Sequence, residues 1–177
     1  MAASDARRIG ERRVRTRDRR EADRRSGVDR RDETAWKPIA IDPSDSSSDE
    51  AALVAAAVEA RDFARAPFSR FKVGAALETA AGEVITGCNV ENATYGLTMC
   101  AERVALYKAL SARKEVRFTR IAVVADTPEP TPPCGSCRQL LWEYCGDIEV
   151  VLATPTQVTR RLMLSALLPL PFDVRLL

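Results

Sequence analysis

The chain has 177 residues, 46% of them hydrophobic, and a formal net charge of +2, which suits one domain with a core and is too short for two large ones. Residues 1–49 hold 13 Lys/Arg and 11 Asp/Glu, whereas residues 50–177 hold 14 of each. A neutral body disfavours nucleic-acid binding, because phosphate recognition requires a concentrated basic footprint. The chain has neither an apolar run of membrane-spanning length nor a signal core, so we expect no membrane partner.

The first 46 residues form an arginine-rich extension for which we expect disorder. Residues 1–35 contain 12 arginines and no aromatic residue, and such a composition cannot bury enough apolar area to offset its ordering entropy. A solvated helix around residues 5–25 is the alternative structure. An accessory tail is the simpler role, and weak binding of RNA or another anion is the alternative role. The folded domain is expected to span residues 47–177.

The first elements expected in this domain are a helix and a hairpin. Ser47-Ser48-Asp49-Glu50 offers a capping box for an alanine-rich helix over residues 51–64. Residues 71–77 and 83–90 have strand character and flank a turn at Ala81-Gly82, which predicts a β-hairpin. The following residues, up to about Thr98, have the composition of a loop.

The second half of the domain alternates helices with strands. Helices are predicted over residues 99–112 and 134–145, and four prolines keep residues 127–133 extended between them. Further segments are expected as strands at 121–125, 148–153 and 160–164, with a last turn or short helix at 167–168. This order predicts an α/β protein, a three-layer α/β/α sandwich with a mixed β-sheet.

Three cysteines have the spacing of a metal site. Cys134 and Cys137 form a C-x-x-C pair at the start of a predicted helix, and Cys100 stands at the start of another. The chain has no histidine, so three thiolates are the soft-metal ligand set that it offers. Three protein ligands leave the fourth tetrahedral position of Zn²⁺ open, as catalytic zinc sites do. We therefore predict one catalytic zinc ion per chain.

Glu102, two residues after a predicted ligand, is well placed as a general base. Zinc lowers the pKa of a bound water toward 7, and a nearby carboxylate can take its proton and pass it on. Three thiolates leave the zinc centre with a net negative charge that opposes this step. Helix N-termini would offset that charge, as would a guanidinium bonded to a sulfur; Arg103 is our choice over Arg138.

Other interpretations of the cysteines are weaker. A structural zinc site normally closes with four ligands, but the remaining Cys88 and Cys145 make no second C-x-x-C pair and read as small buried hydrophobes. A redox role for Cys134 and Cys137 would leave Cys100 and Glu102 unexplained. Five cysteines, an odd number, fit a reducing cytoplasm better than a disulfide framework.

Several motifs together resemble one enzyme family. Cys100-Ala101-Glu102 followed by Pro133-Cys134-Gly135-Ser136-Cys137 is similar to the C-A-E and P-C-x-x-C signature of the zinc nucleoside deaminases. Phe71–Leu77 resembles the family's F-x-V-G-A-A-L strand, Gly87–Ala93 its G-C-N-[IV]-E-N-A stretch, and Leu167-Leu168-Pro169 its closing L-L-P. The cysteine in the first ligand position resembles the small, homotetrameric cytidine deaminases. The similarity covers roughly residues 50 to 175.

The resemblance implies an activity and a set of site residues. The activity would be hydrolytic deamination of cytidine and 2′-deoxycytidine to uridine and 2′-deoxyuridine, with release of ammonia, in pyrimidine salvage. Glu102 would act as proton shuttle beside zinc held by Cys100, Cys134 and Cys137. Substrate contacts would come from Phe71 (stacking on the base), Asn89 and Glu91 (ribose hydroxyls) and the backbone of Ala101 (base edge). Tyr95 and Phe172 would reach a neighbouring subunit's site in a homotetramer.

The sequence also shows departures and leaves alternatives open. Phe68 stands where the family often has tyrosine, and Pro132 where serine or threonine is usual. Deamination of a cytosine-nucleoside antibiotic of the blasticidin-S type is an alternative enzyme activity, although the Asn89–Ala93 stretch favours ordinary nucleosides. An RNA-binding or editing protein and a non-catalytic zinc scaffold are further alternatives. The neutral body argues against the first of these, and an intact Glu102 against the second.

Overall fold

The computed structural model describes residues 49–113, 115–173 and 176. The arginine-rich extension, its predicted boundary at residue 46 and the first two residues of the predicted capping box lie outside them. The described elements run from helix α3 (Asp49–Asp62) to helix α6 (Leu164–Leu167). No helix among these residues combines the length and the hydropathy needed to cross a bilayer.

A five-stranded mixed sheet with the order β2-β1-β3-β4-β5 forms the middle layer. Its antiparallel pairs are β1 with β2, β1 with β3, and β4 with β5, while β3 and β4 run parallel. The strands are β1 (Val73–Thr79), β2 (Val84–Cys88), β3 (Phe118–Ala125), β4 (Glu149–Ala153) and β5 (Val158–Met163). Strands β1 and β3 are buried along nearly their whole length, because helices cover both faces of the sheet.

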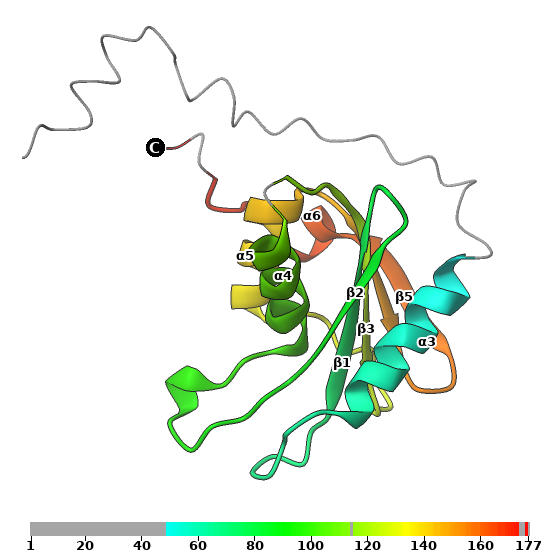
Figure 1. Ribbon diagram of the computed structural model, residues 1–177, viewed down its shortest axis with the longest axis vertical. Helices are drawn as coiled ribbons and strands as arrows, with labels where there is room; N and C mark the ends of the chain where they lie inside the picture. The colour runs from blue at the N-terminus through cyan, green and yellow to red at the C-terminus, as the bar shows by residue number, and fades with distance from the viewer. Residues whose placement is uncertain (1–48, 114, 174–175, 177) are drawn as a thin grey trace, which may run out of the picture. The chain divides into compact units, whose positions relative to one another are not determined.

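Helices form the two outer layers (Figure 1). Helix α3 lies on one face, and α4 (Ala101–Ala112) and α5 (Gly135–Cys145) lie on the other. The core is accordingly divided in two. The smaller part, under α3, includes Leu53, Ala76 and Val124, and the larger, under α4 and α5, includes Leu106, Ile121 and Leu141. The predicted three-layer α/β fold with a mixed sheet is confirmed.

Two glycines let helices approach the sheet closely on opposite faces. A Cβ atom at Gly74 of β1 would lie 2.6 Å from the backbone nitrogen of Arg61 in α3. A Cβ atom at Gly87 of β2 would lie 2.5 Å from the backbone nitrogen of Ala105 in α4. Separations this short are steric clashes, so only glycine fits at these two positions without moving a helix.

The predicted elements are all present, with small differences at their ends. The first strand begins at Val73 rather than at residue 71, because the side chain of Asn89 takes the Val73 amide and Phe71 carbonyl that a ladder would use. Strand β3 starts three residues earlier than predicted, at Phe118. The loop after β2 contains a short 3₁₀ turn, η2 (Tyr95–Leu97), that the sequence did not indicate. Helix α5 ends at the positive-φ Gly146, as expected.

Candidate active site

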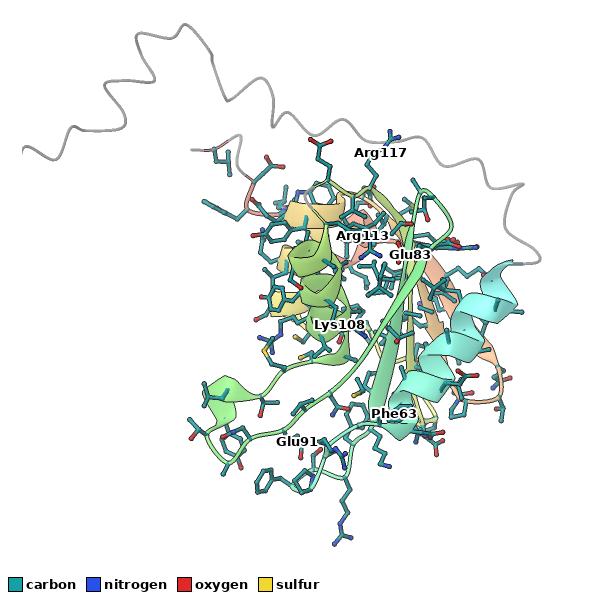
Figure 2. All side chains as sticks on the ribbon, in the orientation of Figure 1. Phe63, Glu83, Glu91, Lys108, Arg113 and Arg117 are labelled. Atoms are coloured by element: carbon teal, nitrogen blue, oxygen red, sulfur yellow. The ribbon has the colours of Figure 1, made fainter. Side chains whose placement is uncertain are left out.

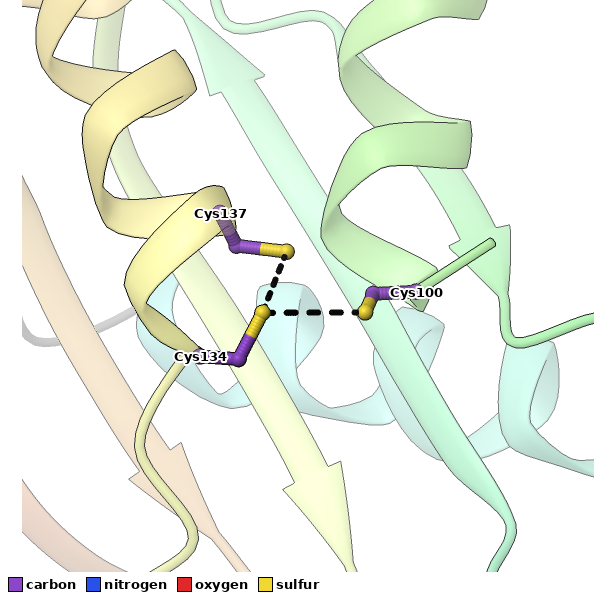
Figure 3. Close-up of side chains that lie close together, drawn as sticks. All are labelled: Cys100, Cys134 and Cys137. Atoms are coloured by element: carbon purple, nitrogen blue, oxygen red, sulfur yellow. Dashed lines mark hydrogen bonds between the residues drawn. The ribbon is translucent and has the colours of Figure 1, made fainter. Parts of the chain in front are cut away.

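The fold brings the three predicted zinc ligands together. Cys100 is the N-cap of α4, Cys134 is the N-cap of α5, and Cys137 lies in the first turn of α5. The Sγ atoms of Cys100 and Cys134 are 3.8 Å apart, and those of Cys134 and Cys137 are 3.5 Å apart (Figure 3). The two helices lie side by side on the same face of the sheet, so residues 34 positions apart in sequence meet at their N-termini.

The geometry of this cluster fits a tetrahedral zinc ion. Zinc–sulfur bonds of about 2.3 Å place two ligand sulfurs about 3.8 Å apart. All three Sγ atoms lie within 4.8 Å of one another, so one ion can reach all of them after small adjustments. Both helix N-termini direct the positive end of a helix dipole at the thiolates, which stabilises their charge. With three ligands, the fourth position of a zinc ion would remain open to the cavity.

Glu102 is the charged group buried beside these sulfurs. Its side chain belongs to the first turn of α4, and the residue is only 5% exposed. Burial raises the pKa of the Glu102 carboxyl to about 7, since a low-dielectric surrounding disfavours the charged form. A carboxyl in this range can both hold and release a proton near neutral pH.

The two candidate arginines have different partners. The Arg103 guanidinium donates to the Sγ atom of Cys100 at 3.4 Å and to the Thr98 carbonyl at 3.0 Å. Hydrogen bonds from the Cys137 thiol and from Arg103 lower the pKa of Cys100 to about 5. Arg138 donates instead to the carbonyls of Pro133 and Leu167, which ties the loop before α5 to the C-terminal segment. The guanidinium that contacts a sulfur is therefore that of Arg103.

A cavity of about 240 Å³ opens in front of Cys100, Cys134 and Glu102. It contains four of the predicted substrate contacts, Phe71, Asn89, Glu91 and Ala101. Pro132, noted above as a departure from the family pattern, also lines it. Six other lining residues had not been predicted from the sequence: Ser69, Val73, Thr98, Met99, Val123 and Thr131. The cavity therefore has a sulfur-lined end with Glu102 and a second end lined by residues from the segments after α3 and β2.

Asn89 holds the backbone at this second end. It is 7% exposed. Its Nδ2 donates to the Phe71 carbonyl at 2.8 Å, and its Oδ1 accepts from the Val73 amide at 2.8 Å. Each amide atom thus already has one backbone partner, while the second Nδ2 hydrogen and the second Oδ1 lone pair can still serve a ligand.

Glu91 accepts three hydrogen bonds from the segment that follows α3. Its Oε2 accepts from the amides of Phe68, at 2.8 Å, and Ser69, at 3.2 Å, and its Oε1 accepts from the Ser69 hydroxyl. The bond from Ser69, with those from the two amides, holds the pKa of the Glu91 carboxyl below its usual value. Figure 2 shows Glu91 at the same end of the molecule as Phe63, which follows α3.

Tyr95 and Phe172 do not line the cavity of their own chain. Tyr95 lies in η2 and is 84% exposed, and Phe172 near the C-terminus is 58% exposed. The backbone of Phe172 is held by the side chain of Gln139, which donates to its carbonyl and accepts from its amide.

The positions of Ser69 and Thr131 in the cavity wall could not have been found from sequence periodicity, because both residues lie in loops.

Comparison with known proteins identifies the family. Residues 47–154 match the family model described as the cytidine and deoxycytidylate deaminase zinc-binding region. The chain is 50% identical over 123 residues to a cytidine deaminase of Halalkalibacterium halodurans, covering 68% of this chain and 92% of the relative. It is 44% identical to a cytidine deaminase of Sporosarcina psychrophila, covering 68% and 89% of the two chains.

Solved structures give the same result. A cytidine deaminase from Burkholderia pseudomallei superposes with a TM-score of 0.65 at 50% identity, covering 69% of this chain and 98% of that one. A cytidine deaminase from Mycobacterium tuberculosis superposes with a TM-score of 0.59 at 40% identity, covering 71% and 98%. With a family match over more than half of its length and three sulfurs gathered at two helix N-termini, the chain belongs to the zinc-binding cytidine and deoxycytidylate deaminase family.

Proposed function

We propose that the protein is a zinc-dependent cytidine deaminase, which hydrolyses cytidine and 2′-deoxycytidine to uridine and 2′-deoxyuridine and releases ammonia. The observation that carries the proposal is the three-sulfur cluster of Cys100, Cys134 and Cys137, with a buried Glu102 beside it at one end of a cavity. Relatives that are 44% and 50% identical over 68% of this chain are named cytidine deaminases.

Glu102 acts as the proton carrier in this proposal. A zinc ion held by the three thiolates would polarise a water molecule and make it nucleophilic near neutral pH. The Glu102 carboxylate accepts a proton from the attacking water and delivers it to the pyrimidine N3. It then transfers the second proton of that water to the amino group, which leaves as ammonia while C4 keeps the oxygen. Protons and oxygen balance with one water consumed for each ammonia released.

The other end of the cavity binds the nucleoside. Phe71 provides an aromatic face for the pyrimidine, and the backbone of Ala101 reads the base edge. The Glu91 carboxylate accepts hydrogen bonds from the ribose hydroxyls. The Asn89 amide, through its unused hydrogen and lone pair, donates to and accepts from them. The Glu91 carboxylate would repel a phosphate at the sugar, so the proposed substrate is a free nucleoside and not a nucleotide or a polynucleotide.

The first experiment follows ultraviolet absorbance of the purified protein with cytidine, 2′-deoxycytidine, cytidine monophosphate and blasticidin S, and measures zinc in the same sample. Turnover of the two nucleosides with about one zinc per chain is the expected result. Turnover of blasticidin S alone would show that the protein deaminates a cytosine-nucleoside antibiotic instead of cytidine. Stoichiometric zinc without turnover of any of these compounds would refute the proposal.

A homotetramer with shared active sites is the proposed assembly. The residues that support it are large, apolar and exposed: Phe63 (72%), Phe68 (57%), Tyr95 (84%), Leu97 (64%) and Phe172 (58%). Aromatic residues are enriched in surfaces that a partner covers. In such a tetramer Tyr95 and Phe172, which do not line their own cavity, would complete a neighbouring one. Light scattering, which gives the mass of the assembly in solution, tests whether four chains associate.

Subunit mixing tests the sharing of sites directly. A Glu102→Gln subunit lacks its own proton carrier, and a Tyr95→Ala subunit lacks the side chain offered to its neighbour. If Tyr95 acts across the interface, tetramers co-expressed from both variants contain some sites with both groups intact and are more active than either parent. Activity equal to the mean of the parents would contradict a shared site.

Two further proposals concern the rest of the chain. A cytoplasmic location is supported by the cysteine cluster, since these thiols bind metal only in their reduced form. An accessory role of the 1–46 extension is supported by its composition, beside a catalytic domain over residues 47–177. Deletion of residues 1–46 should leave zinc content and nucleoside turnover unchanged.

A further inference from the structure

The loop between α3 and β1 is held by a chain of hydrogen bonds that runs along the cavity wall. It begins at Glu91, which accepts from Ser69 through both carboxylate oxygens. The same Ser69 hydroxyl accepts from the Phe71 amide at 2.9 Å. Asn89 then donates to the Phe71 carbonyl. The two polar groups proposed for the sugar and the aromatic ring proposed for the base therefore belong to one connected network.

Ser69 occupies the branch point of this network. Its hydroxyl has one hydrogen, given to Glu91, and one lone pair used by the Phe71 amide. The side chain thus fixes the position of the carboxylate and of the Phe71 backbone together. Neither alanine nor any other residue without a hydroxyl or comparable polar group can make both bonds.

The backbone at Arg70, between Ser69 and Phe71, adopts a conformation that needs such support. Arg70 has φ = 59°, in the left-handed region, which is unfavourable for residues other than glycine and asparagine. Its amide is bonded to the Ala66 carbonyl at 3.0 Å. Strained backbone of this kind persists where surrounding contacts over-determine it. The Ser69 hydroxyl, which accepts from the amide of Phe71 on the other side of Arg70, is one of those contacts.

We propose that Ser69 is a positioning residue that couples sugar recognition by Glu91 to base recognition by Phe71. The inference rests on the proposed function, because it concerns how a nucleoside is held. Its consequence is specificity. An intact network places the carboxylate where it meets a ribose hydroxyl only when Phe71 is also in place, so a substrate without those hydroxyls gains less from Ser69.

The test compares cytidine with 2′,3′-dideoxycytidine in the wild type, Ser69→Ala and Ser69→Thr. The Ser69→Ala variant should keep its zinc and raise the KM for cytidine roughly tenfold, the equivalent of one hydrogen bond to a charged group. The kcat/KM for cytidine divided by that for the dideoxy substrate should fall, because the dideoxy substrate loses less. Ser69→Thr retains the hydroxyl and should preserve most of the discrimination.

A second readout does not depend on activity. Amide hydrogen exchange at Phe71 should accelerate in Ser69→Ala and stay slow in Ser69→Thr, since only alanine removes the acceptor. The matched control is Ser111→Ala. The hydroxyl of this exposed serine on α4 donates to the Lys108 carbonyl, and within the described part of the chain it has no other side-chain hydrogen bond. It should change neither the exchange at Phe71 nor the substrate ratio.

The outcomes separate the two proposals. Wild-type protein with stoichiometric zinc and no cytidine turnover would refute the proposed function. Active wild type, with Ser69→Ala unchanged in substrate ratio and in Phe71 exchange, would overturn the role of Ser69 alone. An equal loss on both substrates would also overturn it, because Ser69 would then only support the cavity wall.

Discussion

The two ends of the cavity are built in different ways. At the metal end, Cys100, Cys134 and Cys137 stand at the N-termini of α4 and α5, two helices packed on the buried sheet. At the end proposed to bind the sugar, called the sugar end below, Ser69 and Glu91 lie in exposed or half-exposed segments outside the regular elements and are held by side-chain hydrogen bonds. The residues proposed for the chemistry thus lie on rigid elements, whereas the proposed sugar recognition depends on a local network that single substitutions can loosen.

Loss of a ligand should give the largest effect and destroy the metal end. Cys134→Ala leaves two thiolates of the three that define the site, so zinc should be lost and turnover abolished. Because metal binding stabilises the folded state, the melting temperature should also fall, to the value reached when a chelator strips the wild type. Metal analysis and thermal unfolding check this. One zinc per chain in Cys134→Ala would show that the ligand set is wrong.

Removal of the proposed proton carrier should abolish most of the turnover and leave the metal in place. Glu102→Gln preserves the shape of a buried side chain but cannot accept a proton, so kcat should fall about a thousandfold or more. Zinc content and nucleoside binding should stay near the wild-type values. Single-turnover kinetics with metal analysis make the measurement, and substantial residual turnover would contradict the proton-carrier assignment.

A change at the helix–sheet contact should affect the metal end through the backbone. Gly87→Ala places a Cβ atom against the backbone of α4, the helix whose N-cap is Cys100. Overpacking of this kind typically costs about 1–3 kcal/mol of unfolding free energy, and we expect weaker zinc binding as well. Denaturant unfolding and zinc competition check both. The control is Gly96→Ala, where a Cβ atom meets no other group within 4 Å; equal losses in the two variants would rule out the contact as the cause.

The sugar end should respond with a smaller change confined to substrate binding. Asn89→Asp keeps the acceptor for the Val73 amide but loses the donor to the Phe71 carbonyl. We expect the KM for cytidine to rise about tenfold, the value of roughly one hydrogen bond, with zinc content unchanged. Steady-state kinetics with metal analysis measure both quantities. A loss of zinc in this variant would show that the two ends are not independent.

Much of this protein could be predicted without coordinates, because the relevant signals are local. The apolar run at residues 121–125, the prolines of residues 127–133 and Gly146 mark a buried strand, an extended loop and a helix end through backbone and solvation preferences of a few residues. Cys134 and Cys137 are one helical turn apart, so their convergence follows from the 3.6-residue repeat.

The tertiary structure alone decided which distant groups meet and what each has left to offer. Cys100 reaches the C-x-x-C pair because α4 and α5 pack on one face of the sheet, and Arg103 contacts a sulfur where Arg138 contacts carbonyls. Ser69 meets Glu91 across 22 residues, in a loop without periodicity. Side-chain hydrogen bonds of that kind depend on where two loops cross, a property of the packed chain that no local sequence preference encodes.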